Sequence, residues 1–421
     1  MESSNRNFGI WFICDRMRIL RADRSNRSAY FFALNLFMKN ELFDVLIVYS
    51  NRLATSASIL KDEALLPFAK GSGNESYNVV YGYFLKICQK NRLKVAFTTS
   101  ADIIGAGKCQ SYWLYEGNSW VKVGKTGYSK LIFDKFAPVN KKMKNNRSLL
   151  FSSKKIKPFN QPYLYDLFFD KQKTYAKLHQ FSIPTVSIVK SVYKACKTLK
   201  EITREHLYKE DFSDEIVIKD RFGAGGRNVY KFKVDQTKKI AELLKKHNKK
   251  SFVIQPFIRF DKGFSYKNSS VSTDIRLIYL GGKIIQTYIR MAKAGDFRCN
   301  EHQGGTLKYI PKSQVPTNVL LTSNKIAKVL NKNSSLYALD FIVSNNGNIY
   351  LLEGNTGPGL DWNLSSKENE IEAQKLIRII VKKLVKLARP SKTTKKESEN
   401  IAIGAPVADT RSAVASIFAR I

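Results

Sequence analysis

Residues 336–361 read Leu-Tyr-Ala-Leu-Asp-Phe-Ile-Val (336–343), Ser-Asn-Asn-Gly-Asn (344–348) and Ile-Tyr-Leu-Leu-Glu-Gly-Asn-Thr-Gly-Pro-Gly-Leu-Asp (349–361). Apolar, β-branched and aromatic runs on either side of Asn-Gly are a strong signal for a β-hairpin. If Asn346 and Gly347 are the two loop residues, Asn345 pairs with Asn348. Counting outward, Asp340 then lies directly opposite Glu353. The stretch therefore predicts a hairpin with two facing carboxylates.

Facing carboxylates repel each other, so a positive group should lie between them. Side-chain alternation places Asn355 on the same face as Glu353. Carboxylate and amide oxygens are the ligands that Mg²⁺ takes, usually together with water and substrate phosphates. A surface hairpin with solvated acids is the alternative, but it explains neither the apolar neighbours nor the Gly-Pro-Gly turn at 357–359. We therefore predict a metal site of Asp340, Glu353 and Asn355, for Mg²⁺ or Mn²⁺. On this argument, Asp340→Asn should keep or raise the thermal stability.

The chain has 421 residues, a net charge of +36, 43% hydrophobic and 12% aromatic residues. This length fits two or three domains, and the hydrophobic content indicates a globular protein. A strong positive charge attracts nucleotides, acidic peptides, nucleic acid or anionic membranes. Because a biased genome can also raise the lysine content, the charge is weak support for nucleic-acid binding.

The five cysteines are widely spaced and never form a CxxC pair. This pattern favours reduced thiols in the cytoplasm and argues against a zinc site. The first apolar run, at residues 8–14, is too short for a signal-peptide core or a membrane span. We therefore expect a cytoplasmic protein without membrane contact. The cysteines are Cys14, Cys88, Cys109, Cys196 and Cys299.

Residues 1–150 alternate between strand and helix patterns. Strands are predicted at 8–14, 45–49 and 94–98, and helices at 28–40 and 77–90, which is typical of an open, largely parallel α/β sheet. A hairpin is predicted at 112–123 and a lysine-rich linker at 138–158. Gly105-Ala106-Gly107-Lys108 is not a P-loop, because Asp102 and Cys109 stand where glycine and Ser or Thr are required.

A glycine loop, Asp-Arg-Phe-Gly-Ala-Gly-Gly-Arg at 220–227, lies between predicted strands at 215–219 and 229–232. It joins two strands, whereas Rossmann and Walker loops join a strand to a helix. Such a hairpin can fold over phosphates with its backbone N–H groups, and Lys219 before it can supply a positive charge. Glycine-rich turns are also common without a ligand, so this signal is modest by itself.

The rest of the chain continues with strands and helices. A strand at 251–258 contains Pro256, which implies a sheet edge or a strand end. Strands at 274–280 and 283–291 form a hairpin about Gly281-Gly282, and without a bulge Arg290 faces away from Arg276. Helices are predicted at 235–248, capped by Asp235, at 323–330 and at 367–387. The inward residues of the last helix are Ile371, Leu376, Ile379, Ile380 and Leu384. Residues 390–410 are predicted to be a mobile tail, followed by a short helix from about residue 409.

The polar loop at 290–305 reads Arg-Met-Ala-Lys-Ala-Gly-Asp-Phe-Arg-Cys-Asn-Glu-His-Gln-Gly-Gly. It resembles the R-x-A-K-x-G-D-F-R-x-N-x-H-x-G-G signature of RimK-type ligases in the ATP-grasp superfamily. Asp340, Glu353 and Asn355 match the superfamily's D…E-x-N metal pattern, and the resemblance covers about 159–361. The regions around Trp120 and at 159–171 are also similar to spore-coat-associated ATP-grasp proteins.

This resemblance implies α/β and α+β architecture: an N-terminal α/β domain (1–150), an ATP-grasp domain (151–388) whose lid subdomain spans about 185–255, and a tail (389–421). It implies that Lys171 and Lys219 contact the α- and β-phosphates, and that 255–258 hydrogen-bond adenine. Arg298 would stabilise the transferred phosphoryl group. For His302, a substrate role and a plain loop hydrogen bond remain equally open. The implied residues are, for catalysis, Arg298, Arg276 and Arg290, and, for ATP, Lys171, Lys219, Gly223, Gly225, Gly226, Gln255, Phe257, Ile258 and Asp274.

The function implied by the resemblance is ATP-dependent ligation of a carboxylate to an amine, such as an amino acid, a peptide or a protein terminus. Glutamate is one candidate substrate, nucleic acid is not expected as one, and an oligomer is compatible with the sequence. The alternatives are an ATP-grasp kinase and a basic nucleic-acid- or ribosome-associated protein that binds nucleotide. The second alternative has no motif beyond the charge.

Overall fold

The computed structural model describes residues 40–59, 65–189, 191–267, 269–330, 335–360 and 366–389. The strand expected at 8–14, nearly all of the helix expected at 28–40, and the tail and helix expected after 389 lie outside these residues. The described residues group into two compact units. The first holds residues up to 89, 94–177 and 354–357; the second holds 90–93, 178–353 and 358–389. The chain passes from the first unit to the second between residues 177 and 178. The domain limits predicted from the sequence, 1–150, 151–388 and 389–421, remain predictions.

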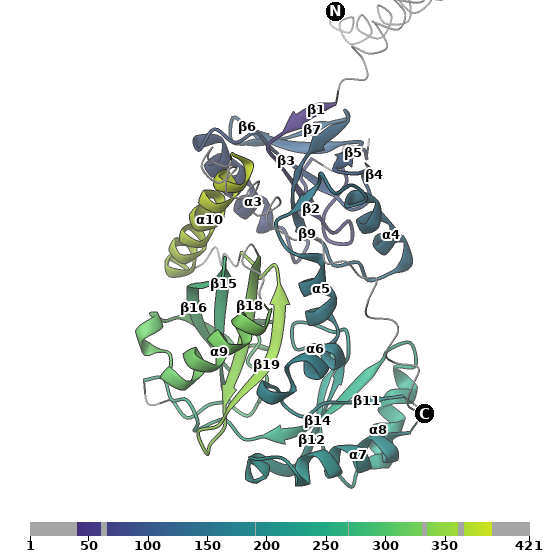
Figure 1. Ribbon diagram of the computed structural model, residues 1–421, viewed down its shortest axis with the longest axis vertical. Helices are drawn as coiled ribbons and strands as arrows, with labels where there is room; N and C mark the ends of the chain where they lie inside the picture. Colours follow the sequence, from purple (N-terminus) through teal and green to yellow (C-terminus); the bar gives the residue numbers. More distant parts are fainter. Residues whose placement is uncertain are drawn as a thin grey trace, which may run out of the picture. The chain divides into compact units, whose positions relative to one another are not determined.

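The first unit is built on a six-stranded sheet with the order β10-β9-β2-β3-β6-β7 (Figure 1). β2 (Val45–Tyr49) lies parallel to β3 (Val95–Thr99) and β9 (Leu131–Lys135), and β9 lies parallel to β10 (Lys157–Pro158). β6 (Tyr112–Glu116) and β7 (Ser119–Val123) add an antiparallel hairpin. The predicted, largely parallel α/β sheet is therefore confirmed. Helix α3 (Tyr77–Lys90) buries an apolar face, and β1 (Glu41–Phe43), β8 (Gly127–Ser129), β5 (Lys108–Cys109) and β4 (Ile103–Gly105) form a small second sheet.

The linker predicted at 138–158 is wrong, because helix α4 (Lys141–Leu150) occupies most of it. The Asn140 side chain accepts a hydrogen bond from the Met143 N–H and caps the helix. Met143, Arg147 and Leu150 are buried on one face, so a few well-spaced side chains are enough to dock this lysine-rich helix. Helices α5 (Pro162–Phe169) and α6 (Lys171–Leu178) follow, and the Asp170 carboxylate accepts hydrogen bonds from the N–H groups of Gln172 and Lys173 near the start of α6.

The second unit contains two antiparallel sheets, and we call the first of them the lid sheet. Its order is β11-β14-β12-β13, comprising Val186–Ile188, Phe252–Ile258, Phe212–Asp220 and Val229–Lys233. Helices α7 (Val192–Arg204) and α8 (Thr237–Lys246) pack on one face through Ala195, Leu199 and Ile240 (Figure 1). The helix cap predicted at Asp235 is wrong, since the N-cap position is Gln236 and only the Asp235 backbone carbonyl contacts the helix.

Pro256 does not mark an edge strand, because β14 lies between β11 and β12. The pairing with β11 ends at Ile254, so Pro256 lies just beyond the last partner on that side. Its missing N–H is therefore not needed by β11.

The core sheet of the second unit has the order β17-β16-β15-β18-β19. Helix α9 (Thr317–Leu330) begins six residues before residue 323, where the sequence predicts its start. On α10 the buried residues are Ala373, Leu376, Ile377, Ile380, Val381 and Leu384, while Ile371 and Ile379 are 42% and 37% exposed, contrary to the prediction. Within the described residues, no helix is long and apolar enough to cross a lipid bilayer. The bounds are Thr306–Tyr309 (β17), Lys283–Met291 (β16), Thr273–Leu280 (β15), Leu336–Val343 (β18), Ile349–Thr356 (β19), Thr317–Leu330 (α9) and Lys367–Ala388 (α10).

Two details of the core sheet differ from the predicted pairing. The β18–β19 turn contains residues 345–347, because the Ser344 N–H donates to the Asn348 carbonyl and Gly347 takes φ +87°. The predicted pair Asn345–Asn348 is therefore wrong. In the β15–β16 hairpin a bulge shifts the register near Ile278, so Arg290 lies opposite Asp274 rather than Thr273. Arg290 and Arg276 thus share one face, which overturns the opposite-face expectation.

Candidate active site

Four buried charged residues of the core sheet form a charge cluster: Asp274 and Arg276 on β15, Arg290 on β16 and Asp340 on β18. Arg276 donates from Nε to Oδ1 and from Nη2 to Oδ2 of Asp340, each over 2.5 Å. Arg290 donates to both oxygens of Asp274 and to Oδ2 of Asp340, each over 2.8 Å. Arg276 lies opposite Asp340 in the strand register, so the sheet itself brings the pair together.

The positive group expected near Asp340 and Glu353 is thus present in the chain itself. Arg276 Nη2 lies 3.7 Å from Glu353 Oε1 as well as contacting Asp340. This arrangement corrects the expectation that Asp340→Asn would keep or raise stability, because the carboxylate is held by two arginines rather than repelled by an acid. Sequence reasoning also missed Tyr288, whose hydroxyl accepts from Arg276 Nη1 over 3.1 Å. Its only signal is its place two residues before Arg290 on the same strand.

Burial and ion pairing have opposite effects on the pKa values of Asp274 and Asp340. Burial raises the pKa of Asp274 to about 6, although the Arg290 guanidinium opposes the rise. Burial acts in the same sense on Asp340, but the Arg276 and Arg290 charges outweigh it and lower its pKa to about 2. Asp340 is therefore a carboxylate at neutral pH and presents negative charge at this point of the sheet.

The donor set at the predicted metal site suits a hard cation, with one restriction. Within the described residues no group of three or more His, Cys, Asp or Glu side chains could hold a metal, so the Asn355 amide would be needed. Glu353 and Asn355 are alternate residues of β19 and share a face, but Asn355 falls in the first compact unit, so its place beside Asp340 stays a prediction. Oδ2 of Asp340 accepts two hydrogen bonds from the arginines and Oδ1 accepts one, which makes Oδ1 the less occupied oxygen for a cation.

The glycine loop lies against the loop at 292–305, which we call the signature loop. Gly225 and Gly226 take φ +68° and +69°. A Cβ added at Gly226 would lie 2.7 Å from Asn300 Oδ1, and one at Gly225 would lie 3.2 Å from His302 Cδ2. The glycines therefore permit an approach that side chains would obstruct. His302 lies at this junction, and Asn300 is a contact that sequence reasoning missed.

The lid sheet presents the residues expected to bind ATP on the face opposite α7 and α8. Strand alternation and register place Lys219, Val217 and Gln255 on this face. Val217, Phe257 and Ile258 belong to an apolar cluster that also includes Ile342 and Tyr350 of the core sheet. The Gln255 Nε2 group donates to Thr185 Oγ1 over 2.7 Å, while its buried Oε1 has no hydrogen-bond partner among the described residues.

Arg298 lies in the signature loop and is paired within it. Its guanidinium contacts the Asp296 carboxylate, with 2.7 Å between Nη2 and Oδ2, and its side chain is 32% exposed. The hydrogen bond from Arg298 lowers the pKa of Asp296. Lys171 is the first residue of α6 and belongs to the first unit, so its expected phosphate contact stays a prediction.

A family model described as RimK-like ATP-grasp domain matches residues 169–380, which is about half of the chain. The chain belongs to the RimK-like ATP-grasp family. The matched residues include the charge cluster, the glycine loop, the signature loop and the predicted metal ligands. The sequence resemblance to RimK-type ligases is thereby confirmed.

Curated relatives with this domain are named probable alpha-L-glutamate ligases. One from Marinomonas sp. is 30% identical over 176 residues, 41% of this chain and 55% of that protein. One from Hydrogenovibrio crunogenus is 28% identical over 145 residues, 34% of this chain and 42% of that protein. The chain thus matches about half the length of these relatives.

Two solved enzyme structures are similar in fold to this chain. VanG D-Ala:D-Ser ligase from Enterococcus faecalis matches with a TM-score of 0.51 at 12% identity, covering 83% of this chain and 100% of that one. D-alanyl-alanine synthetase A from Vibrio cholerae matches with a TM-score of 0.50 at 14% identity, covering 83% and 99%. Together with the family model, these likenesses confirm the predicted ATP-grasp fold class.

Proposed function

We propose that this protein is an ATP-dependent carboxylate–amine ligase. A substrate carboxylate oxygen attacks the γ-phosphorus of ATP, which gives an acyl phosphate and ADP. An amine then attacks the acyl carbon, phosphate leaves, and the nitrogen loses a proton to form the amide. The observation that carries the proposal is the buried charge cluster beside Glu353, inside a RimK-like ATP-grasp domain.

Asp340, through Oδ1, with Glu353 and Asn355 would hold the magnesium ion. When bound, this ion neutralises phosphate charge and orients the phosphates for in-line transfer. Arg276 and Arg290 would position Asp340, since both guanidinium groups are buried and directed at carboxylates. We keep both arginines in the site, together with Asp274, which orients Arg290.

The remaining site residues would bind ATP and exclude water. Lys219 would supply positive charge to the phosphates, and the backbone of Gly223, Gly225 and Gly226 would cover them. The N–H groups of Gly225 and Gly226 would be the donors, since the Gly223 N–H already donates to the Asp220 carbonyl. Arg298 would leave part of its contact with Asp296 and stabilise charge that develops on the transferred phosphoryl group. The apolar cluster around Phe257 and Ile258 would pack against adenine.

Glutamate is the first substrate to test, because the curated relatives are probable alpha-L-glutamate ligases. The partner would be another amino acid, a peptide or a protein terminus. The four cysteines in the described residues are free thiols, and burial raises the pKa of Cys109 to about 12. These thiols support the cytoplasm as the proposed location.

Hydroxylamine trapping tests the reaction class. With ATP, Mg²⁺ and either N-acetylglutamate or an N-acetylated peptide that ends in glutamate, so that no substrate amine is present, hydroxylamine should yield a hydroxamate and increase ADP release. Asp340→Asn should abolish both signals. A stable phosphorylated alcohol without hydroxamate would make the protein a kinase instead.

A further inference from the structure

A groove of about 570 Å³ lies on the helix-covered side of the lid sheet. It is lined by the first turn of α7, by α8 and by β14, and its lining is mainly apolar. Val189 and Tyr193 are 80% and 71% exposed there, beside the half-buried Leu244 and the buried Phe252. Large apolar side chains exposed together at a groove are typical of an interaction site.

This groove is separate from the residues expected to bind ATP. Phe252 and Ile254 point toward α7 and α8, whereas Gln255 and Lys219 lie on the other face of the same sheet. A ligand in the groove and a nucleotide on the opposite face would therefore bind without sharing side chains.

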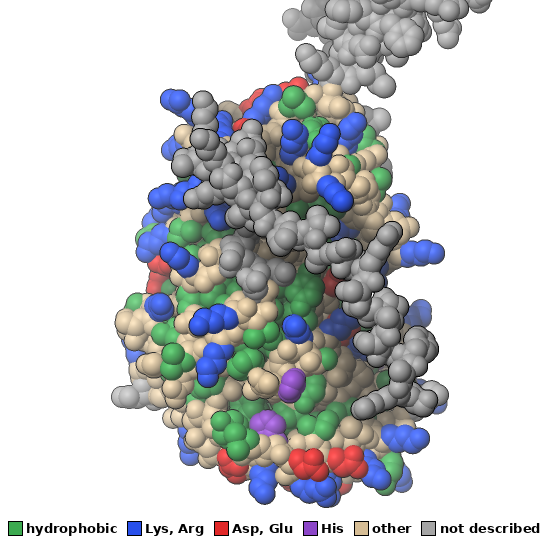
Figure 2. Space-filling view, in the orientation of Figure 1, with side chains coloured by type: hydrophobic (Ala, Val, Ile, Leu, Met, Phe, Trp, Pro, Cys, Tyr) green, Lys and Arg blue, Asp and Glu red, His purple; other side chains and the backbone are tan. Residues whose placement is uncertain are grey.

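The electrostatics of the groove favour an acidic partner. Among the described residues, no aspartate or glutamate lines it, whereas Lys238 and Lys250 do, and Lys250 also lies 3.5 Å from Asp220. Helices α7 and α8 and residues 247–250 together carry nine lysines and one arginine but only two glutamates. Figure 2 shows that Lys and Arg side chains also far outnumber acidic ones on the visible face. A groove with an apolar floor and a lysine rim complements a chain that has acidic residues around an apolar one.

We propose that this groove binds an acidic peptide segment and takes one large apolar side chain of that segment against Tyr193 and Leu244. The volume suits a few side chains. A nucleic acid fits less well, because single strands bind through successive aromatic stacking platforms. Here the aromatic side chains of the lining are Tyr193 and the buried Phe252. The proposal does not depend on the ligase activity, since its readout is binding.

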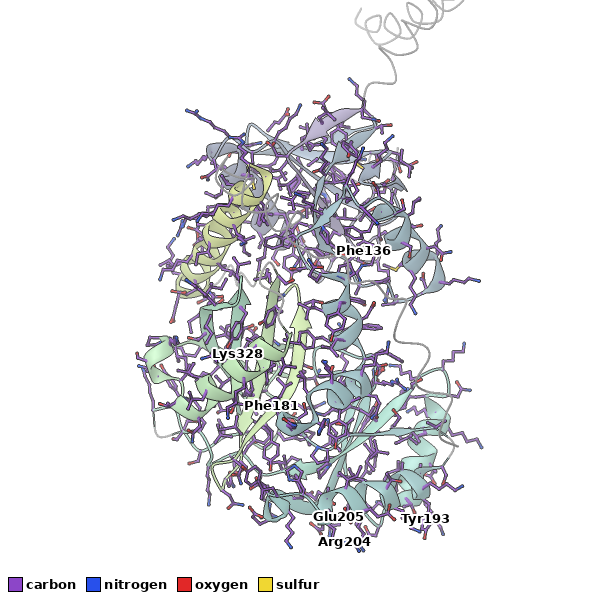
Figure 3. The ribbon with its side chains drawn as sticks, in the orientation of Figure 1. Phe136, Phe181, Tyr193, Arg204, Glu205 and Lys328 are labelled. Atoms are coloured by element: carbon purple, nitrogen blue, oxygen red, sulfur yellow. The ribbon has the colours of Figure 1, made fainter. Side chains whose placement is uncertain are left out.

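Fluorescence anisotropy with the full-length protein tests this binding. The probe is a fluorescein-labelled dodecapeptide with five glutamates on each side of a central Leu-Phe. Tyr193→Ser should weaken binding about tenfold, because it removes the apolar contact with the central side chains of the probe. Lys238→Glu should weaken binding by a similar factor, because it reverses a charge that attracts the glutamates. Tyr193 lies in the first turn of α7 (Figure 3), and its exposure makes Tyr193→Ser compatible with folding.

Matched controls separate the groove from general attraction. Leu207→Ser removes another apolar side chain that is 80% exposed, and Lys328→Glu reverses an exposed lysine on α9 (Figure 3). Both should bind the probe within about twofold of the wild type. A dodecapeptide of glutamate alone should bind at least tenfold more weakly than the probe.

The proposal is overturned if Tyr193→Ser binds normally, or if the all-glutamate peptide or a labelled twelve-nucleotide single strand binds as tightly as the probe. Each of those outcomes would mean that charge attraction alone explains the binding of the probe. Saturating MgADP should not displace the probe, and displacement by MgADP would place the peptide at the nucleotide residues instead. Unchanged ADP release by Tyr193→Ser would agree with a groove separate from the active site.

Discussion

Arg276 holds Asp340 with two parallel hydrogen bonds of 2.5 Å between strands that lie side by side in the core sheet. Arg290 adds a third hydrogen bond to the same carboxylate. The residue predicted to bind the metal is therefore already neutralised by the chain's own cations. A metal ion must share Asp340 with them.

Asp340→Asn should lower the free energy of unfolding by about 3 kcal/mol, because it removes the carboxylate that pairs with the buried Arg276 guanidinium and leaves Arg290 with Asp274 alone. Thermal denaturation measures the loss. Glu353→Gln is the matched control, since its side chain is 28% exposed and lies 3.7 Å from Arg276. This variant should melt close to the wild type, while both variants lose Mg²⁺-dependent turnover. An unchanged melting temperature for Asp340→Asn would contradict the ion pairing described here.

Asp274 should make stability fall as pH rises between about 4 and 6. Burial raises its pKa to about 6 from 3.8, so the folded state binds this proton more tightly than the unfolded state. The slope from this group is at most about 1.4 kcal/mol per pH unit. Asp340 acts oppositely, since its contribution is present above about 4 and is lost as pH falls toward 2.

Urea unfolding of the wild type and Asp274→Asn at several pH values isolates the Asp274 effect. The variant lacks the proton, so the stability of the wild type relative to the variant should decrease from pH 4 to 6 and level off above that. A difference that grows with pH would show that Asp274 is ionised throughout.

Gly226→Ala should raise the KM for ATP because the new Cβ would push the glycine loop away from Asn300. Gly71→Ala is a suitable control, since Gly71 has φ +75° but nothing within 4 Å of an added Cβ. Both variants should lose about 1 kcal/mol of stability from the left-handed backbone. Only Gly226→Ala should change steady-state ATP kinetics, and equal KM values in both variants would refute the contact.

Lys219→Met should weaken MgADP binding roughly tenfold, because it removes a positive charge from the side of the lid sheet that is proposed to bind the nucleotide. Calorimetric titration gives the dissociation constants. The exposed Lys233 on the neighbouring strand provides the control, and Lys233→Met should bind within about twofold of the wild type. If both variants bound MgADP equally weakly, the loss would reflect the overall positive charge of the protein and not a contact made by Lys219.

The sequence predicts the strands and most helices well where the apolar periodicity is strong, as in β2, β14, β18 and α3. It fails at α4, because helix docking there depends on Met143 and Leu150 amid lysines. It also fails at the register of the two hairpins. The three-residue turn before Asn348 and the bulge near Ile278 are settled by packing and local hydrogen bonds, which a pattern of residue types does not contain.

In the candidate site, too, some features can be predicted from the sequence and others cannot. The signature loop and the acids of 340–355 are recognisable from residue types and spacing alone. The pairing of Arg276 and Arg290 with Asp340 and Asp274 is not, because it requires the register of three strands. The contact of Asn300 with Gly226 joins segments far apart in the chain, so no local signal predicts it.

The bulge near Ile278 determines how the β15–β16 hairpin tolerates insertions and deletions. Ile278 pairs with Gln286 and Tyr279 with Ile284, which leaves Ile285 as one residue more than a regular ladder needs. Deleting Ile285 would straighten the strand and still leave Arg290 opposite Asp274. Inserting a residue would demand a second bulge or move Arg290 to the far face. The hairpin should therefore accept a one-residue deletion at this place and reject an insertion.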